Sequence, residues 1–265
     1  MATRRTLGRG TRPPQSEPLW SVLPLSDARH YPNLELEANE KLRATNYAEG
    51  TAREEHLAGR ILLKHVAARL LEFAGIPGAE DHHVSISRYC PGCAASDHGI
   101  PSLHIPDRQP IPVSYSRCAG HLLVALHPVA GLLGADLADH SRRVFHEHPR
   151  ESDFANYAFS PAERRGLGRL TRQKRAIRGA QWWALKEAIA KATGEGLAGE
   201  DGIAVVAGRR RHRLLKDAQT KTLWCMPGHT DSLGNLMPSG LLGAVLWSQQ
   251  PALENAVRSN TNPPA

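Results

Sequence analysis

The chain is poor in aromatic residues and has no long apolar run. Only 5% of its 265 residues are Phe, Trp or Tyr, which leaves few rings for stacking on nucleic-acid bases. No uninterrupted apolar stretch approaches the roughly 18 residues of a membrane span, and residues 1–15 lack the apolar core of a secretory signal. We therefore expect a cytoplasmic protein with no membrane partner.

Cysteine is also scarce. The four cysteines are Cys90, Cys93, Cys118 and Cys225, and the first two form a Cys-x-x-Cys pair with His98 close behind. A structural zinc ion generally takes four ligands at short spacings, and the sequence has no second Cys-x-x-Cys and no His-x-x-x-His. The sequence therefore favours ordinary reduced cysteines over a zinc site, and a disulfide is less favoured still in a cytoplasmic chain.

Acidic residues are outnumbered by basic ones. The formal net charge is +7, and arginines gather at 142–143, 164–178 and 209–211. Such a surface suits an anionic partner, namely nucleic acid, a phosphorylated cofactor or an acidic protein, and charge alone does not choose among them. Because zinc-finger spacing and an aromatic RNA-binding motif are absent, a nucleic-acid-binding module is the weaker alternative, and we expect no nucleic-acid partner.

The apolar residues that are present predict a large core and a mixed fold. Hydrophobic residues make up 41% of the chain. Residues 1–18 and 255–265 lack periodic apolar content and are expected to form a flexible leader and tail. Apolar spacing predicts helices at 52–73 and 161–193, and strands at 84–89, 111–114, 122–126, 132–137, 203–207, 222–226 and 241–247. A helix followed by several strands, twice, predicts an α+β fold with lobes at 19–128 and 129–254.

One segment presents an acid and a base together. At helical spacing Trp182 and Leu185 share one face, whereas Glu187 and Lys191 share the opposite one. An ordinary exposed ion pair has the same pattern. Asp136, however, lies in an apolar run that predicts a buried strand. Two acids from separate elements can share one hard cation.

Five short motifs follow one another between residues 53 and 197. They are His98-Gly99-Ile100-Pro101, Ser114-Tyr115-Ser116, Gly134-Ala135-Asp136-Leu137-Ala138, Phe159-Ser160-Pro161-Ala162-Glu163, and the helical segment from Trp183 to Lys191. Each is weak alone, but in this order and at these gaps the chain resembles the surfactin-type 4'-phosphopantetheinyl transferases.

The resemblance implies a fold and an activity. The fold would be two similar α+β lobes in a pseudo-twofold arrangement, with the active site in the cleft between them. The activity would be magnesium-dependent transfer, with manganese as a substitute, of the phosphopantetheine arm of coenzyme A to a serine of an acyl or peptidyl carrier protein, releasing 3',5'-ADP. The resemblance also suggests a monomer that serves polyketide or nonribosomal peptide assembly.

The resemblance further implies roles for individual residues. Asp136, Glu187 and Glu163 would hold the metal, and Glu187 and Lys191 would act in catalysis, with the general base open between them. The coenzyme contacts would be Arg60, Lys64, His98, Gly99, Pro101, Ser114, Tyr115, Ser116, Lys186 and Lys191. Glu163 has an alternative role, since an acid in the first turn of a helix is favoured by the helix dipole. Arg60 and Lys64 fit solvated helix charges equally well.

The chain departs from the family pattern at two positions. Ala138 stands where the family has a second acid, and the side chain of Asp139 would point to the other face of a continuing strand. Tyr115 replaces a histidine and carries no positive charge near neutral pH. These departures motivate an alternative, namely a catalytically impaired protein that binds coenzyme A or a carrier.

Overall fold

The structure is a computed structural model that describes residues 17–31, 36–78, 84–197, 203–205, 212–217 and 219–248. The expected tail at 255–265, most of the expected leader and the arginines at 209–211 lie outside these residues. The elements of the first half are β1 (Leu19–Pro24), η1 (Leu25–His30), α1 (Ala38–Ala44), α2 (Thr51–Phe73), β2 (Ser85–Tyr89), β3 (Ile100–His104), β4 (Ile111–Cys118) and β5 (His121–Leu126). Those of the second half are β6 (Leu132–Asp139), α3 (Arg143–His146), α4 (Asp153–Ala158), α5 (Pro161–Gly168), α6 (Arg172–Thr193), η2 (Arg213–Lys216), β7 (Thr220–Cys225) and β8 (Leu241–Ser248).

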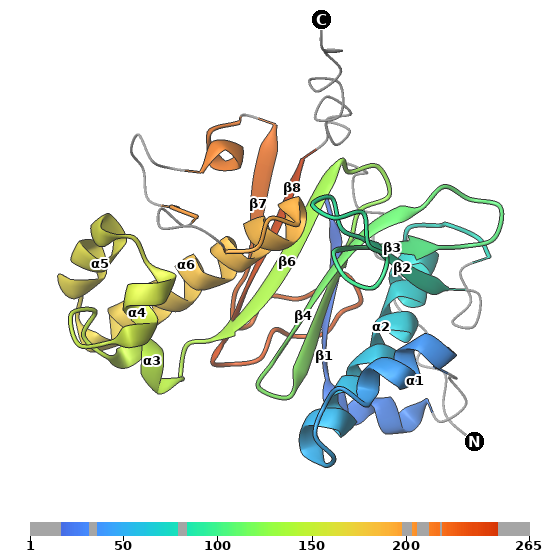
Figure 1. The fold of residues 1–265 in the computed structure, drawn as a ribbon, viewed down its shortest axis with the longest axis horizontal. Coiled ribbons are helices and arrows are strands. Elements are labelled where there is room, and N and C mark those ends of the chain that lie inside the picture. Colours follow the sequence, from blue (N-terminus) through green and yellow to red (C-terminus); the bar gives the residue numbers. More distant parts are fainter. Residues whose placement is uncertain are drawn as a thin grey trace, which may run out of the picture.

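The fold is a mixed α+β arrangement with two antiparallel sheets (Figure 1). The first sheet has the order β1-β5-β4-β3-β2, and the second has the order β6-β8-β7. Each sheet carries one long helix, α2 on the first and α6 on the second. The coarse class that the sequence predicts is therefore observed, while an internal twofold relation stays a prediction.

Strand alternation explains why the two sheets share a core. Successive side chains of a strand point to opposite faces. In β5, Leu122 and Val124 pack in the cluster under α2, whereas Leu123 and Ala125 pack in a cluster that also contains Leu137 of β6. That second cluster is built from both sheets. The predicted lobe boundary falls in the connection between β5 and β6, but the halves on either side are packed together.

Most predicted elements are present. The helix at 52–73 is α2, and the helical stretch at 161–193 is divided into α5 and α6. The strand expected at 203–207 is reduced to single-residue pairing at Ala204, and 206–207 lie outside the described residues. The sequence missed β1 and β3, each of which contains a proline that disfavours a strand. Neither of the long helices, nor any other helix in the described ranges, is apolar enough over sufficient length to cross a membrane.

Candidate functional site

The site begins with Asp136 on β6. Ala135 and Leu137, the neighbours of Asp136, pack between the sheets, so Asp136 and Ala138 point to the other face, toward α6. Ala138 is buried in the α6 cluster. Asp139 accepts hydrogen bonds from the backbone and hydroxyl of Ser141 at 2.8 and 2.6 Å. Asp139 therefore caps a turn and does not replace the missing second acid.

A glycine allows α6 to approach β6 closely. A Cβ atom on Gly134 would lie 1.8 Å from the carbonyl oxygen of Ala188, so only glycine fits between strand and helix. This contact brings the Lys191 ammonium to 2.6 Å from Asp136 Oδ1. Lys191 Nζ also donates to the carbonyl oxygens of Tyr115 and Ala135, each at 3.2 Å.

The two serines of β4 connect it to β6. Ser116 Oγ donates to Asp136 Oδ1 at 2.7 Å, and Ser114 Oγ accepts from the amide of Ala135 at 2.8 Å. Both serines are buried. Their hydrogen bonds join the first sheet to the second beside Asp136, which is a positioning role that the sequence did not anticipate.

Glu187 lies half-buried on the same face of α6 as Lys191. Burial raises the pKa of Glu187, the nearby Asp136 carboxylate raises it further, and Lys191 partly offsets the rise. Two carboxylates that repel each other in a partly buried place are a suitable ligand set for a divalent cation, because a cation would relieve the repulsion. The residues present therefore fit the magnesium site that the sequence predicts.

Ser114, Glu187 and Lys191 line a cavity of about 530 Å³, whereas Asp136 and Ser116 are not among its lining residues. Seven predicted site residues line it: His98, Gly99, Pro101, Ser114, Tyr115, Glu187 and Lys191. Gly99 has φ 96°, and a Cβ atom there would lie 2.3 Å from the carbonyl oxygen of Tyr89. Only glycine tolerates this conformation and this close approach. The part of the cavity wall formed by Gly99 therefore lies directly against the end of β2.

Arg60 and Lys64 were predicted to contact the coenzyme, but neither lines the cavity. Both are buried on α2 and pair with Glu40 of α1, whose carboxylate lies 3.1 Å from Lys64 Nζ and accepts from Arg60 Nε at 2.9 Å. Burial alone would raise the pKa of Glu40, but Arg60, the backbone amide of Glu37 and Lys64 together lower it. Glu40 pairs with both cations, and Glu37 also pairs with Lys64 at 3.6 Å. Lys64 does not line the cavity, and Arg60 is joined to it through the Tyr115 hydroxyl.

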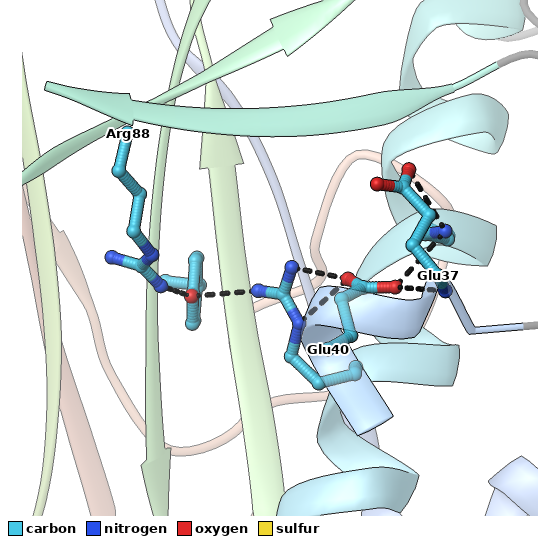
Figure 2. Close-up of polar contacts among 6 residues, drawn as sticks. Glu37, Glu40 and Arg88 are labelled. Atoms are coloured by element: carbon cyan, nitrogen blue, oxygen red, sulfur yellow. Dashed lines mark hydrogen bonds and ion pairs between the residues drawn. The ribbon is translucent and has the colours of Figure 1, made fainter. Parts of the chain in front are cut away.

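Arg88 on β2 is a cavity residue that the sequence analysis missed. Its guanidinium donates to the Tyr115 hydroxyl, which also accepts from Arg60 Nη1 at 2.8 Å. Figure 2 shows this line of contacts running from Arg88 to Glu40 and Glu37. The Tyr115 hydroxyl thus contacts two guanidinium groups. The only signal in the sequence was an arginine inside the predicted strand at 84–89.

Glu163 and Lys186 form a buried ion pair. Lys186 Nζ lies 2.7 Å from Glu163 Oε2, which also accepts from the Ser160 amide at 2.8 Å, while Oε1 accepts from the Val205 amide at 2.8 Å. Glu163 is fully buried and Lys186 is 3% exposed. Neither lines the cavity. The predicted metal role of Glu163 and coenzyme role of Lys186 are thus corrected: Glu163 is the acid of a capping box at the start of α5.

Comparison with known proteins bears on the second half of the chain. Residues 132–226 match the model of the 4'-phosphopantetheinyl transferase superfamily. No curated protein matches the chain. The matched segment contains Asp136, Glu187 and Lys191, the three charged residues that the structure brings together. The match supports the 4'-phosphopantetheinyl transferase superfamily for this chain and, with it, phosphopantetheine transfer from coenzyme A in general.

Proposed function

We propose that the protein is a magnesium-dependent transferase of the surfactin type, which moves the phosphopantetheine arm of coenzyme A to a serine of an acyl or peptidyl carrier protein. The observation that carries the proposal is the cluster of Asp136, Glu187 and Lys191 beside a cavity of about 530 Å³, inside the segment that matches the superfamily. Asp136 lies on β6, and Glu187 and Lys191 lie on α6.

Asp136 and Glu187 would hold the divalent cation. The Ser116 and Lys191 hydrogen bonds to Asp136 both reach Oδ1, which leaves Oδ2 for a cation. A cation bound there would neutralise charge that develops on the pyrophosphate of the coenzyme. A single carboxylate from β6 is sufficient when phosphate oxygens and water complete the coordination, since magnesium usually keeps several waters. Ala138 is therefore compatible with activity.

Lys191 and Glu187 would divide the remaining chemistry. Lys191 Nζ donates to three oxygen atoms, which is the bonding of an ammonium group with all three protons in use. Such a group can stabilise negative charge on the pyrophosphate. Glu187 would share the cation with Asp136, and the acceptor for the proton of the attacking serine hydroxyl stays open between Glu187 and Lys191.

The carrier would dock on the basic surface of α5 and the start of α6. A cavity of about 520 Å³ there is lined by Arg150, Arg164, Arg165 and Arg169, among other residues. The exposed basic residues Arg172, Lys174 and Arg178 continue this surface. Arg175 is different, because its guanidinium donates to the carbonyl oxygens of His146, Leu167 and Leu170 and so braces the helices. An acidic carrier would be steered by the exposed members.

A second candidate is the catalytically impaired binding protein. It is favoured by Ala138, which removes a carboxylate from the α6 face of β6, and by Asp139, which is turned into its own loop. This candidate keeps the cavity and coenzyme binding but loses transfer.

The experiment is intact-mass spectrometry of apo carrier proteins incubated with the protein, coenzyme A and magnesium. We expect the added mass of one phosphopantetheine arm per carrier. Asp136→Asn should abolish it, whereas Asp153→Asn, at an exposed acid in the first turn of α4, should not. Carriers that stay unmodified while calorimetry shows coenzyme A binding would establish the impaired protein. If the protein neither modified a carrier nor bound coenzyme A but was retained on DNA in a salt-dependent way, nucleic-acid binding would be favoured.

A further inference from the structure

The Cys-x-x-Cys pair lies in a tight loop that joins β2 to β3. These strands pair with Tyr89 opposite Ile100, so the two ends of the loop 90–99 are held side by side. Within the loop, the amide of Cys90 donates to the carbonyl oxygen of Ala95 at 2.9 Å, and the amide of Ala94 donates to that of Cys90 at 2.8 Å. The backbone therefore curls around the Cys90 side chain and returns His98 to it.

Three metal-binding side chains converge inside this loop. The sulfur atoms of Cys90 and Cys93 and a ring nitrogen of His98 all lie within 4.8 Å of one another, and Cys93 Sγ is 3.3 Å from His98 Nε2. Ligands of a tetrahedral zinc ion with bonds of about 2.3 Å to sulfur and about 2.0 Å to nitrogen lie roughly 3.5–3.8 Å apart. Within the described ranges, no other three His, Cys, Asp or Glu side chains converge in this way.

The surroundings orient these groups as ligands. His98 Nδ1 lies 2.7 Å from Asp97 Oδ1, which fixes the imidazole ring and turns Nε2 toward Cys93. Carboxylates in this position commonly support histidine ligands of metals. Cysteine binds a metal as the thiolate.

We propose that Cys90, Cys93 and His98 bind one zinc ion, with water in the fourth position. A donor set of two thiolates and one imidazole selects zinc over magnesium, because magnesium prefers oxygen ligands. Each thiol that binds gives its proton to solvent as its sulfur replaces a water of the hydrated ion. The sequence favoured ordinary cysteines because a second ligand pair was missing, but spacing could not show that the loop closes His98 onto the cysteines.

The zinc ion would brace one wall of the large cavity. Cys90, His98 and Gly99 all line that cavity. The same loop touches the end of α6, since a Cβ atom on Gly194 would lie 2.9 Å from Pro91. The ion would thus hold the loop between the β2–β3 hairpin and α6. The zinc site does not depend on the proposed transferase function.

Cobalt(II) titration of the full chain tests the site. The protein is reduced, freed of metal with a chelator, and titrated with cobalt(II), whose thiolate complexes absorb in the near ultraviolet by charge transfer. We expect one equivalent to bind with this absorption and to be displaced by zinc. Cys93→Ser should remove most of the absorption, whereas the matched variant Cys118→Ser, at a half-buried cysteine on β4, should leave it unchanged.

Two further measurements separate this site from the others. Asp136→Asn should keep the cobalt absorption, because an oxygen-ligand site gives no thiolate charge transfer. Hydrogen exchange of the peptide that spans 90–99 should slow when zinc is added to the wild type but not to Cys93→Ser. The proposal would be overturned if reduced wild-type protein showed no such absorption, or if Cys93→Ser kept it. A Cys90–Cys93 disulfide that resists reduction would also overturn it.

Discussion

At the scale of single residues, Tyr115 holds two guanidinium groups at the cavity that we propose for the coenzyme. Its hydroxyl oxygen accepts hydrogen bonds from Arg60 and Arg88, and the charged centres of these guanidinium groups lie 5.8 and 5.5 Å from the centre of its ring. Arg88 lines the cavity and places positive charge beside Tyr115, whereas Arg60 is paired with Glu40. The hydroxyl proton remains for a phosphate oxygen.

Tyr115→Phe should therefore weaken coenzyme A binding while preserving the fold. Hydrogen bonds to charged groups contribute about 1.5–3 kcal/mol, so we expect affinity to fall about tenfold or more. Isothermal titration calorimetry measures the change. The matched variant is Tyr157→Phe, which also removes a hydroxyl from the cavity lining but at a side chain that is 71% exposed. Equal losses in the two variants would contradict the role assigned to Tyr115.

A second prediction at this scale concerns the buried pair of Glu163 and Lys186. Glu163→Gln leaves the Lys186 charge buried without its partner, so we expect the free energy of unfolding to fall by about 3–5 kcal/mol. The double variant with Lys186→Met should recover part of that loss. Urea unfolding measures stability, and transfer activity per folded molecule should stay near the wild-type value. A selective loss of metal-dependent activity at full stability would restore Glu163 as a metal ligand.

Site residues could be predicted where local periodicity decides their direction. Asp136, Glu187 and Lys191 could be proposed because a strand alternates and a helix repeats every 3.6 residues, and because the motifs that contain them resemble those of the transferases. Arg88 was not found, because its position depends on the pairing of β2, β3 and β4. The partner of Arg60 was missed for the same kind of reason: Glu40 lies on another helix, and sequence gives no measure of how two helices face each other.

At the scale of elements, the contact between β6 and α6 decides whether the site can form. Gly134→Ala would place a methyl carbon against the backbone oxygen of Ala188, which cannot rotate away. We expect the free energy of unfolding to fall by at least about 1–3 kcal/mol, as for overpacked cores, and Lys191 to move from Asp136 with loss of transfer. Thermal unfolding and the mass assay measure these effects.

A matched glycine variant distinguishes crowding from a general effect of alanine. Gly166→Ala lies on α5, where the nearest atom to the new Cβ is 3.4 Å away on the Trp182 side chain. Alanine favours helix by up to about 1 kcal/mol relative to glycine, so stability should be unchanged or slightly higher. Similar destabilisation in both variants would argue against the tight contact.

The ion pairs of Glu40 that join α1 to α2 should make the free energy of unfolding depend on pH in the acid range. Arg60 and Lys64 keep the folded-state pKa of Glu40 below its ordinary value of 4.5 despite burial. The carboxylate therefore stabilises the fold fully above pH 4.5, and that contribution is lost as pH falls from 4.5 through the lower folded-state pKa. We expect Glu40→Gln to lower stability at pH 7 and to flatten its acid dependence in urea unfolding.

The control for this pH dependence is Glu49→Gln. The Glu49 side chain is 93% exposed and lies 3.7 Å from Arg53. Exposed pairs contribute about 0–1 kcal/mol, so the acid profile should match the wild type. An unchanged acid profile in Glu40→Gln would show that the buried carboxylate does not couple α1 to α2.

At the scale of the whole molecule, the two halves are expected to unfold together. The cluster between the sheets takes Trp20 and Leu123 from the first and Val245 and Trp247 from the second. A fragment of residues 17–128 would expose its share of that cluster to water. We expect it to lack a cooperative urea transition, whereas the full chain should show one transition by both fluorescence and circular dichroism. A sharp transition in the fragment would support an independent first lobe.

The order of elements was predictable to a greater extent than their assembly. Long amphipathic segments and apolar runs identified α2, α6 and six strands, β2, β4, β5, β6, β7 and β8. The sequence could not identify β1, whose buried Ser21 donates to Asp231 Oδ2 at 2.7 Å, because that acid lies 210 residues further along the chain. Asp231 also accepts from the amides of Val22, Leu233 and Asn235. This network of hydrogen bonds around Asp231 forms only when distant segments pack together, so local sequence patterns do not predict it.

The long-range hydrogen bonds between β1 and Asp231 can form only late in synthesis of the chain. A ribosome adds roughly 5–20 residues per second, so the 210 residues between Ser21 and Asp231 take about 10–40 seconds to make. Throughout that interval the growing chain carries β1 without the carboxylate that satisfies its hydroxyl and amide. Trp20 and Val22 lack the cluster members on β8, Val245 and Trp247, for longer still. We therefore expect the nascent first half to expose part of the apolar cluster during this interval and to depend on cellular chaperones.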